Sequence, residues 1–345
     1  MLIDRILIVG LGSIGQRHLD IARKKFPDAR IKVLRHSPAK TVPANSDGNF
    51  FSIKDGVKFK PQIAVIANPS VFHVETAIAL VGVGAHLLIE KPISSSLEGI
   101  PELLNICNAR NLVIQVGYNL RFLESLQLFR DELKNNIIGR VLSVRCEAGQ
   151  YLPSWRKNKD YTSSVSASKD LGGGVLLELS HEIDYLRWIF GEVEWVKATL
   201  CHQSNLDIDV EDTAYLVLGF NSKEGNKQLI GTLNLDFIRH DTTRSCVAIG
   251  EKGTLQWDSL TGQVRLYRPD SNNWVELYNN KEEIKKSYYI EWKAFIESIA
   301  QGKKPLIEIE DGIKVLQIVD AARISSESDQ RVTITEESAL YESNS

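Results

Sequence analysis

Short apolar runs alternate with amphipathic stretches through the first third of the chain. The apolar runs cover residues 5–9, 30–35, 62–67, 86–89 and 112–116. Between them, residues 13–25, 71–83 and 97–109 have the spacing of helices with one apolar face. Strands that alternate with helices of this length are typical of a parallel sheet with right-handed crossovers. The pattern predicts an α/β fold that begins with a doubly wound Rossmann domain.

The pattern changes after Gly191, where apolar residues recur at every second position. We expect short strands at 141–151, 193–202, 213–220, 228–237, 245–249, 254–257, 264–267 and 274–277, and helices at 119–134, 281–301 and 309–326. Turn residues between the later strands indicate a large, mostly antiparallel sheet in a meander. Such a sheet can leave one face open, and an open face of this size predicts a subunit interface in a homodimer or homotetramer.

Length and composition narrow the classes of protein that fit. A chain of 345 residues is long for one core, so we expect two domains, at 1–120 and 121–335, with the C-terminal helices packing back on the junction. The net charge of −3 offers no basic field for nucleic acid. No apolar run is long enough to span a membrane, and the first residues lack the pattern of a signal peptide. Four widely spaced cysteines have no metal-ligand spacing, so we predict no metal and a reducing, cytoplasmic location.

A glycine-rich turn joins the first apolar run to the first helical stretch. Gly10, Gly12 and Gly15 form the G-x-G-x-x-G pattern, with Ser13 and Ile14 between the last two glycines. In this context the glycines permit a tight turn, a close approach of the backbone to a diphosphate, and packing of the helix on the strand. The five residues predict a dinucleotide-binding site.

The end of the second apolar run lies where an acid commonly binds the ribose 2′-hydroxyl of NAD. Here the residues are Arg35, His36 and Ser37. A guanidinium and a hydroxyl suit a 2′-phosphate better than a carboxylate does, which favours NADP over NAD. The alternatives are that Arg35 is solvated, or that it stacks on the adenine of either cofactor.

The next strand ends also carry candidate residues. Asn68 and Pro69 follow the third apolar run and precede His73, and Glu90 and Lys91 end the fourth. Ligands of doubly wound sheets lie outside the carboxyl ends of the strands, so we expect these residues on the cofactor side. A lysine at a strand end is usually solvated, but Lys91 stands between an acid and a proline.

Three glycines at 172–174 precede a stretch that reads as one helix. On it Glu178, His181 and Asp184 are spaced i, i+3 and i+6, which places the two carboxylates on either side of the histidine. A histidine held by carboxylates beside a glycine-lined cleft suits proton transfer. The alternative is a buried histidine that its neighbours satisfy.

A polar and aromatic loop precedes the three glycines. Tyr151, Trp155, Arg156 and Tyr161 combine flat amphipathic rings with a fixed cation. Such residues can stack on a sugar or a base and hold a carboxylate or phosphate. This reading favours an anionic or nucleotide-linked sugar, while a surface loop with incidental aromatics is the alternative.

Taken together, these motifs resemble the glucose–fructose oxidoreductase/inositol dehydrogenase (Gfo/Idh/MocA) family. The resemblance rests on the glycine motif, Asn68-Pro69 with His73, Glu90-Lys91-Pro92, the run from Gly117 through Asn119 and Arg121 to Phe122, and the triple glycine with His181 and Asp184. It implies a Rossmann domain, an α/β domain with an open-faced sheet, and hydride transfer between a nicotinamide and a sugar or polyol carbon.

The resemblance also implies roles for individual residues. Lys91 corresponds to the lysine of the family's Glu-Lys-Pro motif and His181 to its catalytic histidine, while Asn119 and Arg121 would hold the substrate. One position departs from the pattern, because Leu177 stands where dehydrogenases of the family commonly have an aspartate. Either Glu178 orients His181 in its place, or Asp184 does so alone.

Three functions fit these observations. The main one is an NADP-preferring sugar oxidoreductase in which His181 accepts the hydroxyl proton and Lys91 stabilises the alkoxide. A second is a glycosidase that uses bound NAD in a transient oxidation, without net change of the cofactor. A third is a dinucleotide sensor without catalysis, against which the presence of both residues speaks.

Overall fold

The computed structural model describes residues 3–36, 41–156, 160–221 and 227–334. The chain forms two compact units. The first unit comprises Met1–Tyr118 and Tyr288–Leu316, and the second comprises Asn119–Ser287 and Gln317–Ser345. The first unit therefore includes a segment from the range predicted for the second domain. Helices α8 (Glu283–Gln301) and α9 (Ile309–Ser328) each contribute residues to both units.

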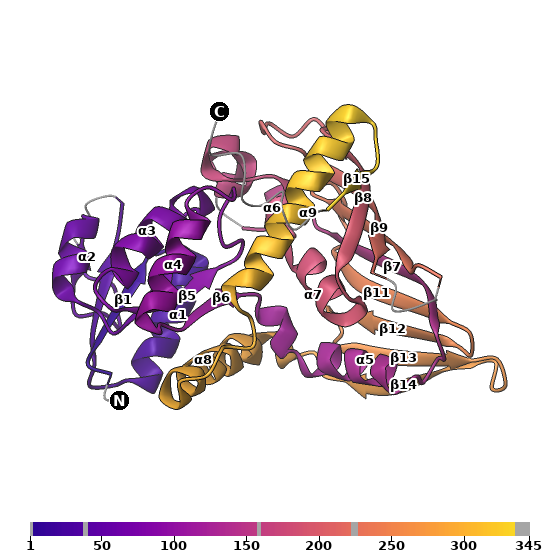
Figure 1. Ribbon diagram of the computed structural model, residues 1–345, viewed down its shortest axis with the longest axis horizontal. Helices are drawn as coiled ribbons and strands as arrows, with labels where there is room; N and C mark the ends of the chain where they lie inside the picture. The colour runs from indigo at the N-terminus through magenta and orange to yellow at the C-terminus, as the bar shows by residue number, and fades with distance from the viewer. Residues whose placement is uncertain (1–2, 37–40, 157–159, 222–226, 335–345) are drawn as a thin grey trace. The chain divides into compact units, whose positions relative to one another are not determined.

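A six-stranded parallel sheet forms the centre of the first unit (Figure 1). Its strands are β1 (Arg5–Val9), β2 (Arg30–Leu34), β3 (Asn49–Phe50), β4 (Ile63–Ile66), β5 (His86–Glu90) and β6 (Ile114–Gly117). The order β3-β2-β1-β4-β5-β6 reverses between β1 and β4, as in doubly wound folds. The predicted Rossmann architecture is confirmed.

Helices cover both faces of this sheet. They are α1 (Ser13–Lys25), α2 (Ile53–Phe59), α3 (His73–Val81), α4 (Ile100–Arg110) and the part of α8 that belongs to the unit. On one face Ile6 and Ile8 pack with Leu19 of α1 and with Trp292 and Phe295 of α8. On the other face, Leu7 lies against α2, at the position of Gly56. Residues 6–9 of β1 are all buried, because the sheet is covered on both faces, which explains the continuous apolar run of this strand.

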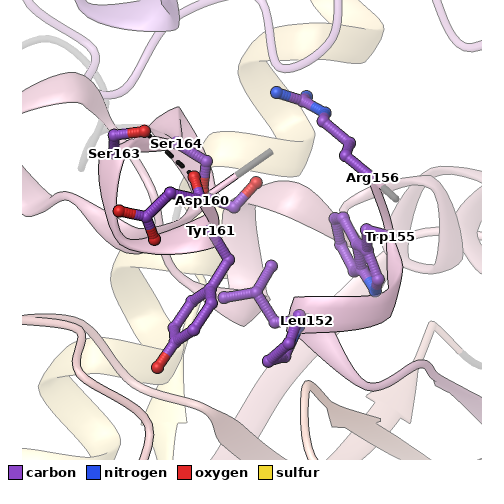
Figure 2. A pocket seen from close by; sticks show the side chains of 9 residues that line it. Leu152, Trp155, Arg156, Asp160, Tyr161, Ser163 and Ser164 are labelled. Carbon is purple, nitrogen blue, oxygen red and sulfur yellow. Dashed lines mark hydrogen bonds between the residues drawn. The ribbon is translucent and has the colours of Figure 1, made fainter. Parts of the chain in front are cut away.

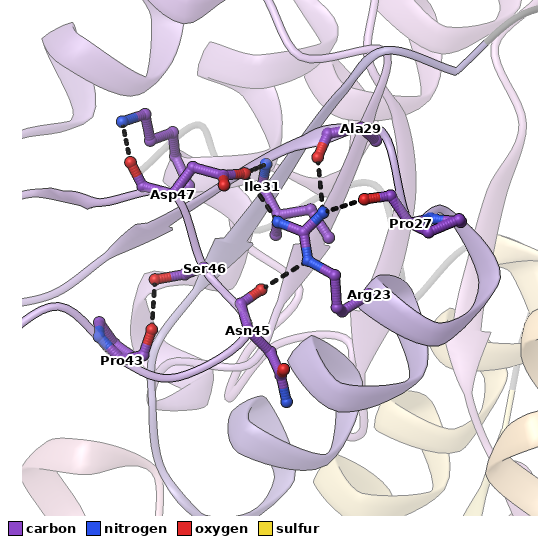
Figure 3. Close-up of polar contacts among 9 residues, drawn as sticks. Arg23, Pro27, Ala29, Ile31, Pro43, Asn45, Ser46 and Asp47 are labelled. Atoms are coloured by element: carbon purple, nitrogen blue, oxygen red, sulfur yellow. Dashed lines mark hydrogen bonds and ion pairs between the residues drawn. The ribbon is translucent and has the colours of Figure 1, made fainter.

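Arg23 fixes the connection between β2 and β3 (Figure 3). Its guanidinium donates hydrogen bonds to the backbone oxygens of Asn45, Pro27 and Ala29 and to the carboxylate of Asp47. Asp47 also accepts the backbone N–H of Ile31 at 2.7 Å. One side chain at the end of α1 thus ties the start of β2 to the segment that precedes β3.

The second unit is built on a nine-stranded sheet of order β14-β13-β12-β11-β7-β10-β9-β8-β15. The strands are β7 (Val141–Gly149), β8 (Val193–Cys201), β9 (Thr213–Phe220), β10 (Ile230–Asp236), β11 (Thr243–Gly250), β12 (Thr254–Asp258), β13 (Gln263–Arg268), β14 (Asn273–Asn279) and β15 (Val332–Thr333). Strands β7 and β10 pair in parallel and the other neighbours are antiparallel. The mostly antiparallel sheet is confirmed, but the simple meander is wrong, because β7 inserts between β10 and β11.

Helices α5 (Glu124–Lys134), α6 (Val175–Glu178) and α7 (His181–Phe190) lie against the sheet of the second unit, together with part of α9 (Figure 1). Ser325 and Ser326 of α9 accept the backbone N–H groups of Ala198 and Leu200 on β8. Along β10, buried and exposed residues alternate, with Ile230 and Asn234 on the exposed side. This alternation is typical of a sheet that has helices on one face only.

Short 3-10 helices occur in the loops of both units. They are η1 (Ser70–Phe72), η2 (Asn119–Phe122), η3 (Leu152–Ser154), η4 (Tyr161–Ser163), η5 (Val165–Ala167) and η6 (Lys169–Leu171). Within the described ranges, each helix is too short or too polar to cross a membrane.

Candidate functional site

The glycine turn of the first unit has two packed positions and one open one. Gly10 has a φ of +85°, and a Cβ there would lie 2.5 Å from the backbone oxygen of Ala67. A Cβ on Gly15 would lie 2.2 Å from the oxygen of Gly10. Around Gly12, in contrast, a Cβ would meet no heavy atom within 4 Å. Gly10 and Gly15 are therefore required by packing, whereas the backbone at Gly12 faces open space.

Helix α1 begins in this open space. Gly12 is its N-cap and provides no side-chain hydrogen bond, and the first turn has no acidic residue. The N–H groups of a helix's first turn have no partner within the helix and attract anions. The backbone of Gly12, Ser13 and Ile14 thus fits the diphosphate of a dinucleotide, as the sequence predicts.

The end of β2 carries the residues expected to recognise the ribose. The backbone N–H of Arg35 donates to the oxygen of Phe50 at 3.0 Å, and its side chain is half-buried. His36 is exposed. Ser37 lies outside the described residues. The chain has a cation and an imidazole at this strand end, where NAD-binding sites commonly have an acid.

His73 connects the ends of two neighbouring strands. Its Nε2 lies 2.8 Å from the backbone oxygen of Asn68, and its Nδ1 lies 3.0 Å from that of Pro92. Burial lowers the pKa of His73, although both carbonyls oppose this effect. The ring is 1% exposed and both nitrogens face carbonyls, and a contact of His73 with the cofactor stays a prediction. The residue holds the loops around Asn68 and Lys91.

The side-chain amide of Asn68 is only partly hydrogen-bonded within the described residues. Its side-chain nitrogen lies 3.4 Å from the hydroxyl of Thr76. Its side-chain oxygen is buried and has no hydrogen-bond partner among the described residues. This acceptor, directly before Pro69, fits a donor on a bound cofactor better than a closed core does.

Glu90 and Lys91 end strand β5 in different environments. One oxygen of Glu90 lies 2.6 Å from Nε2 of His18, and the other accepts the backbone N–H of Lys91 at 3.3 Å. Glu90 is buried, whereas Lys91 is half-buried. The carboxylate of Glu90 therefore holds the backbone from which the Lys91 side chain extends. The prediction that Glu90 touches the cofactor itself finds no support in this geometry.

In the second unit the stretch predicted as one helix is two helices. Helix α6 ends at Glu178, and α7 begins at His181 with Ser180 as its N-cap. The i, i+3 and i+6 spacing of Glu178, His181 and Asp184 on one helix is therefore wrong. The break lies between Glu178, which is half-buried, and His181, which is 8% exposed.

The three glycines before α6 approach the protein's own chain. A Cβ on Gly173 would lie 2.3 Å from the oxygen of Val165, and one on Gly174 would lie 2.4 Å from the carboxylate of Glu211. Glu211 also accepts the backbone N–H of Leu176 in the first turn of α6. The glycines permit this internal packing, and the glycine-lined cleft expected from the sequence is wrong at these two positions.

Asp184 is held by an arginine. The Arg121 guanidinium donates to both carboxylate oxygens of Asp184, at 2.6 and 2.9 Å, and both side chains are almost completely buried. The guanidinium also lies 5.7 Å from the ring of Trp188. Asp184, one of the two acids expected to orient His181, is thus also the partner of Arg121.

Asn119 and Arg121 both have contacts within the second unit. Asn119 is 3% exposed and donates to the hydroxyl of Ser287 at 2.8 Å. Arg121 is 3% exposed and occupied by Asp184. Both side chains have partners within the second unit, and their binding of substrate stays a prediction. They stabilise the start of the second unit.

A cavity of about 350 Å³ lies beside the aromatic loop (Figure 2). It is lined by Leu152, Pro153, Trp155, Arg156, Asp160, Tyr161, Ser163, Ser164 and Ser166. Arg156 is exposed, while Trp155 donates its indole N–H to the oxygen of Gln150 and packs edge-on against Phe237. Tyr151 lies outside this lining, and its ring packs on His240 at 4.3 Å. The cavity thus brings together three of the four predicted loop residues, Trp155, Arg156 and Tyr161.

Several buried polar residues escaped prediction from the sequence. Among them are His18, Glu182 and Glu291. Glu182 is fully buried and pairs with Arg244 at 2.8 Å. His18 could have been noticed because it shares the apolar stripe of α1 with Gly15 and Ala22. The described residues contain no group of side chains suited to a metal ion.

Comparisons with known proteins agree with the two units. Residues 5–118 match the family described as "Oxidoreductase family, NAD-binding Rossmann fold", and residues 130–334 match "Oxidoreductase family, C-terminal alpha/beta domain". The chain belongs to the Gfo/Idh/MocA oxidoreductase family. As a member of this family it is a nicotinamide-dependent oxidoreductase, which confirms the resemblance seen in the sequence.

Individual members of the Gfo/Idh/MocA family show the range of chemistry. Myo-inositol 2-dehydrogenase of Thermotoga maritima is 25% identical over 96% of this chain and 99% of its own length. A levoglucosan dehydrogenase structure with NADH and levoglucosan has a TM-score of 0.83 and 21% identity, over 96% of this chain and 99% of that one. The WlbA dehydrogenase of Bordetella pertussis, with NADH and UDP-GlcNAcA, has a TM-score of 0.80 and 20% identity, over 97% and 99%. At these identities the two structures establish the fold.

Proposed function

We propose that this protein transfers a hydride between a nicotinamide cofactor and a CH–OH carbon of a sugar or sugar derivative. The observation that carries the proposal is the open backbone at Gly12, where helix α1 begins. It lies in a segment that matches the NAD-binding family. The similarity to inositol and levoglucosan dehydrogenases supports a polyol or sugar as the substrate.

Two residues supply catalytic groups in this proposal. A bound nicotinamide supplies the acceptor for the hydride. Lys91, at the end of β5, donates a hydrogen bond to the reacting hydroxyl and stabilises the negative charge that develops on its oxygen. His181, the first residue of α7, accepts the hydroxyl proton. Glu178, at the end of α6, is the proposed orienting acid for His181.

The residues for cofactor binding follow from the first unit. Gly10, Gly12, Ser13, Ile14 and Gly15 form the diphosphate-binding turn, and Asn68 with Pro69 lies at the next strand end. Arg35 and His36, without an acid beside them, lead us to propose NADP(H) as the preferred cofactor. Ser37 remains part of this proposal on sequence grounds.

The substrate class follows from the aromatic loop. Arg156 is an exposed cation beside a cavity that also contains the rings of Trp155 and Tyr161. This combination suits a sugar that carries a carboxylate or a phosphate. The likeness to a dehydrogenase crystallised with UDP-GlcNAcA supports an anionic, nucleotide-linked sugar. Tyr151 is retained as a substrate-binding proposal from the same loop.

A direct assay tests the proposed reaction. Purified protein is incubated with NAD or NADP and a panel of neutral, anionic and nucleotide-linked sugars, and formation of the reduced nicotinamide is followed by absorbance. We expect net reduction with at least one sugar and a lower KM for NADP. Cleavage of a glycoside without net change in nicotinamide would instead identify the hydrolase reaction, and binding of cofactor without turnover of any sugar would identify a sensor.

Assembly and location complete the proposal. The sheet face that carries Tyr215, Ile230 and Asn234 is exposed in the single chain, and we propose it as the contact face of a homodimer or homotetramer. All four cysteines are free, which supports the reducing cytoplasm as the location. Light scattering of the wild-type protein and of a Tyr215→Glu variant measures the assembly, and a monomeric wild type would contradict it.

A further inference from the structure

A chain of three hydrogen bonds links helix α8 to the backbone of Lys91 within the first unit. The indole Nε1 of Trp292 lies 2.8 Å from Nδ1 of His18. Nε2 of His18 lies 2.6 Å from one oxygen of Glu90, and the other oxygen of Glu90 accepts the backbone N–H of Lys91. Trp292 and His18 are fully buried.

The direction of each hydrogen bond follows from the donor inventory. An indole N–H can only donate, so Nδ1 of His18 must accept and carries no proton. A neutral imidazole has its proton on the other nitrogen, so Nε2 of His18 donates to Glu90. The backbone N–H of Lys91 can also only donate. Glu90 therefore accepts on both oxygens, which is the pattern of an ionised carboxylate.

A second buried acid stands on the same helix as Trp292. Glu291 is fully buried, and neither of its carboxyl oxygens has a hydrogen-bond partner among the described residues. The side-chain nitrogen of Gln115 reaches only its backbone oxygen, at 3.4 Å. Burial, and then the negative charge of Glu90, raise the pKa of Glu291 well above its ordinary value. Glu90 thus accepts hydrogen bonds from two donors, whereas Glu291 has no donor among the described residues.

We propose that Trp292 and His18 are positioning residues that keep Glu90 ionised beside a protonated Glu291 and thereby fix the backbone that carries Lys91. The proposal rests on the proposed hydride transfer for its functional consequence. The hydrogen bonds assign the protons of His18 and Glu90, and the proton of Glu291 is assigned from its burial without a donor and from the nearby charge of Glu90. Packing around the chain is also close, because a Cβ on Gly117 would lie 3.2 Å from the carboxylate of Glu90.

Titratable and charged side chains of α1 and α3 lie near the two acids, and the charge of Glu90 also acts on His73 of α3. His18 faces Glu90 from α1, and Arg17, its neighbour on α1, lies 4.5 Å from the ring of Tyr288 on α8. The ring of His18 meets Tyr288 edge-on at 5.9 Å. The positive charge of Arg17 is thus directed to an aromatic face, while His18 reaches Glu90 with its N–H.

The first experiment compares Trp292→Phe with Phe295→Leu. Both substitutions reduce a fully buried ring of the same helix, but only the first removes an indole N–H. Without that donor the proton of His18 can move to Nδ1, and Glu90 loses a hydrogen bond. We expect kcat to fall about tenfold in Trp292→Phe, with the KM for the cofactor changed by less than about twofold, and Phe295→Leu to keep its kcat. Equal kcat values for wild type and Trp292→Phe would overturn the positioning role.

A second pair of variants tests His18 directly. The side-chain nitrogen of Gln can take the place of Nε2 and donate to Glu90, whereas Leu cannot. We expect His18→Gln to retain more of the wild-type kcat than His18→Leu, by about tenfold. The same kcat in both variants would show that the residue serves packing alone.

Spectroscopy tests the proton positions without any substrate. In protein labelled with ¹⁵N at its seven histidines, we expect the His18 ring to show a protonated Nε2 and an unprotonated Nδ1 at neutral pH. Infrared spectra should contain the carbonyl band of a protonated carboxyl group that Glu291→Gln removes. The opposite tautomer, or a band that survives Glu291→Gln, would overturn the assignment. Failure of every sugar as a substrate would refute hydride transfer, while these two spectra would still decide the proton assignment.

Discussion

Arg121 and Asp184 form a bidentate ion pair in the interior of the second unit, with N–O distances of 2.6 and 2.9 Å. Both side chains are at most 3% exposed. Removing one partner of a buried pair leaves an uncompensated charge, which costs more than the pair itself contributes. Loss of either partner is therefore expected to destabilise the protein, because the other charge would remain buried without a counter-charge.

The first prediction concerns this pair. Asp184→Asn keeps the shape of the side chain but leaves the Arg121 cation buried without a counter-charge. We expect the free energy of unfolding to fall by about 3–5 kcal/mol, measured by chemical denaturation. The exposed pair Arg140–Glu251 provides the control, since Glu251→Gln should cost less than about 1 kcal/mol. Equal effects of the two substitutions would contradict the importance of burial.

The glycine turn offers a matched pair of substitutions. Gly12→Ala adds a methyl group to open space, so we expect normal stability and at least tenfold weaker cofactor binding, because the methyl group occupies the place of the diphosphate. Gly15→Ala forces a methyl group to 2.2 Å from the oxygen of Gly10, so we expect a loss of about 1–3 kcal/mol of stability. Titration with cofactor and thermal denaturation separate the two effects. Tight cofactor binding by Gly12→Ala would refute the assigned site.

Substitution of Lys91 tests the proposed hydride transfer. Lys91→Ala removes the proposed donor to the reacting oxygen, and we expect kcat to fall by roughly 10²–10⁴-fold while the Kd for the cofactor stays within about threefold. Steady-state kinetics and equilibrium binding measure the two quantities. Substitution of Lys293, which is exposed on α8, should leave both unchanged. A large loss of cofactor binding with normal turnover of the bound fraction would assign Lys91 to the cofactor instead.

Substitution of Arg35 tests the proposed preference for NADP(H) over NAD(H). If its guanidinium binds the 2′-phosphate, Arg35→Ala should raise the KM for NADPH by about tenfold or more, with little change for NADH. A parallel loss with both cofactors would instead favour stacking on the adenine, which the two cofactors share. Unchanged constants would show that the side chain is solvated.

Glu291 should make the stability of the protein depend on pH. Its folded pKa is raised above 4.5 by burial and by the charge of Glu90, so the folded state binds more protons than the unfolded state above that pH. Its contribution to stability is complete below about pH 4.5 and is lost as the pH rises toward the folded pKa, with a slope of up to about 1.4 kcal/mol per pH unit. Unfolding of Glu291→Gln at several pH values should lack this slope. The exposed Glu297→Gln, on the same helix, should keep it.

Much of the fold was predictable because its signals are local. The apolar runs of the parallel sheet and the two-residue period of the second sheet predicted most strands to within a few residues. The position of β7 between β10 and β11 was not predictable in this way, since the parallel pairing depends on contacts between strands distant in the sequence. The break between α6 and α7, at Leu179 and Ser180, was also missed.

The residues of the candidate site likewise fall into those that the local sequence predicts and those that depend on contacts distant in the sequence. Gly12, Lys91 and His181 belong to short motifs, and each motif predicts from the local sequence whether its residue lies at a strand end or at a helix start. Arg121 and Trp292 do not, because their roles depend on Asp184 and His18 from other elements. A sequence indicates that an arginine is present, but burial decides whether it binds a substrate or an aspartate.

The ring of His73 lies between the backbone carbonyls of two loops. Burial lowers the pKa of its ring, so at neutral pH the imidazole carries a single N–H. Two carbonyl oxygens, from Asn68 and Pro92, lie within hydrogen-bond distance of its two nitrogens. Only one of them can accept that N–H at a time. The tautomer of His73 therefore decides whether its N–H is bonded to the end of β4 or to the loop that follows β5.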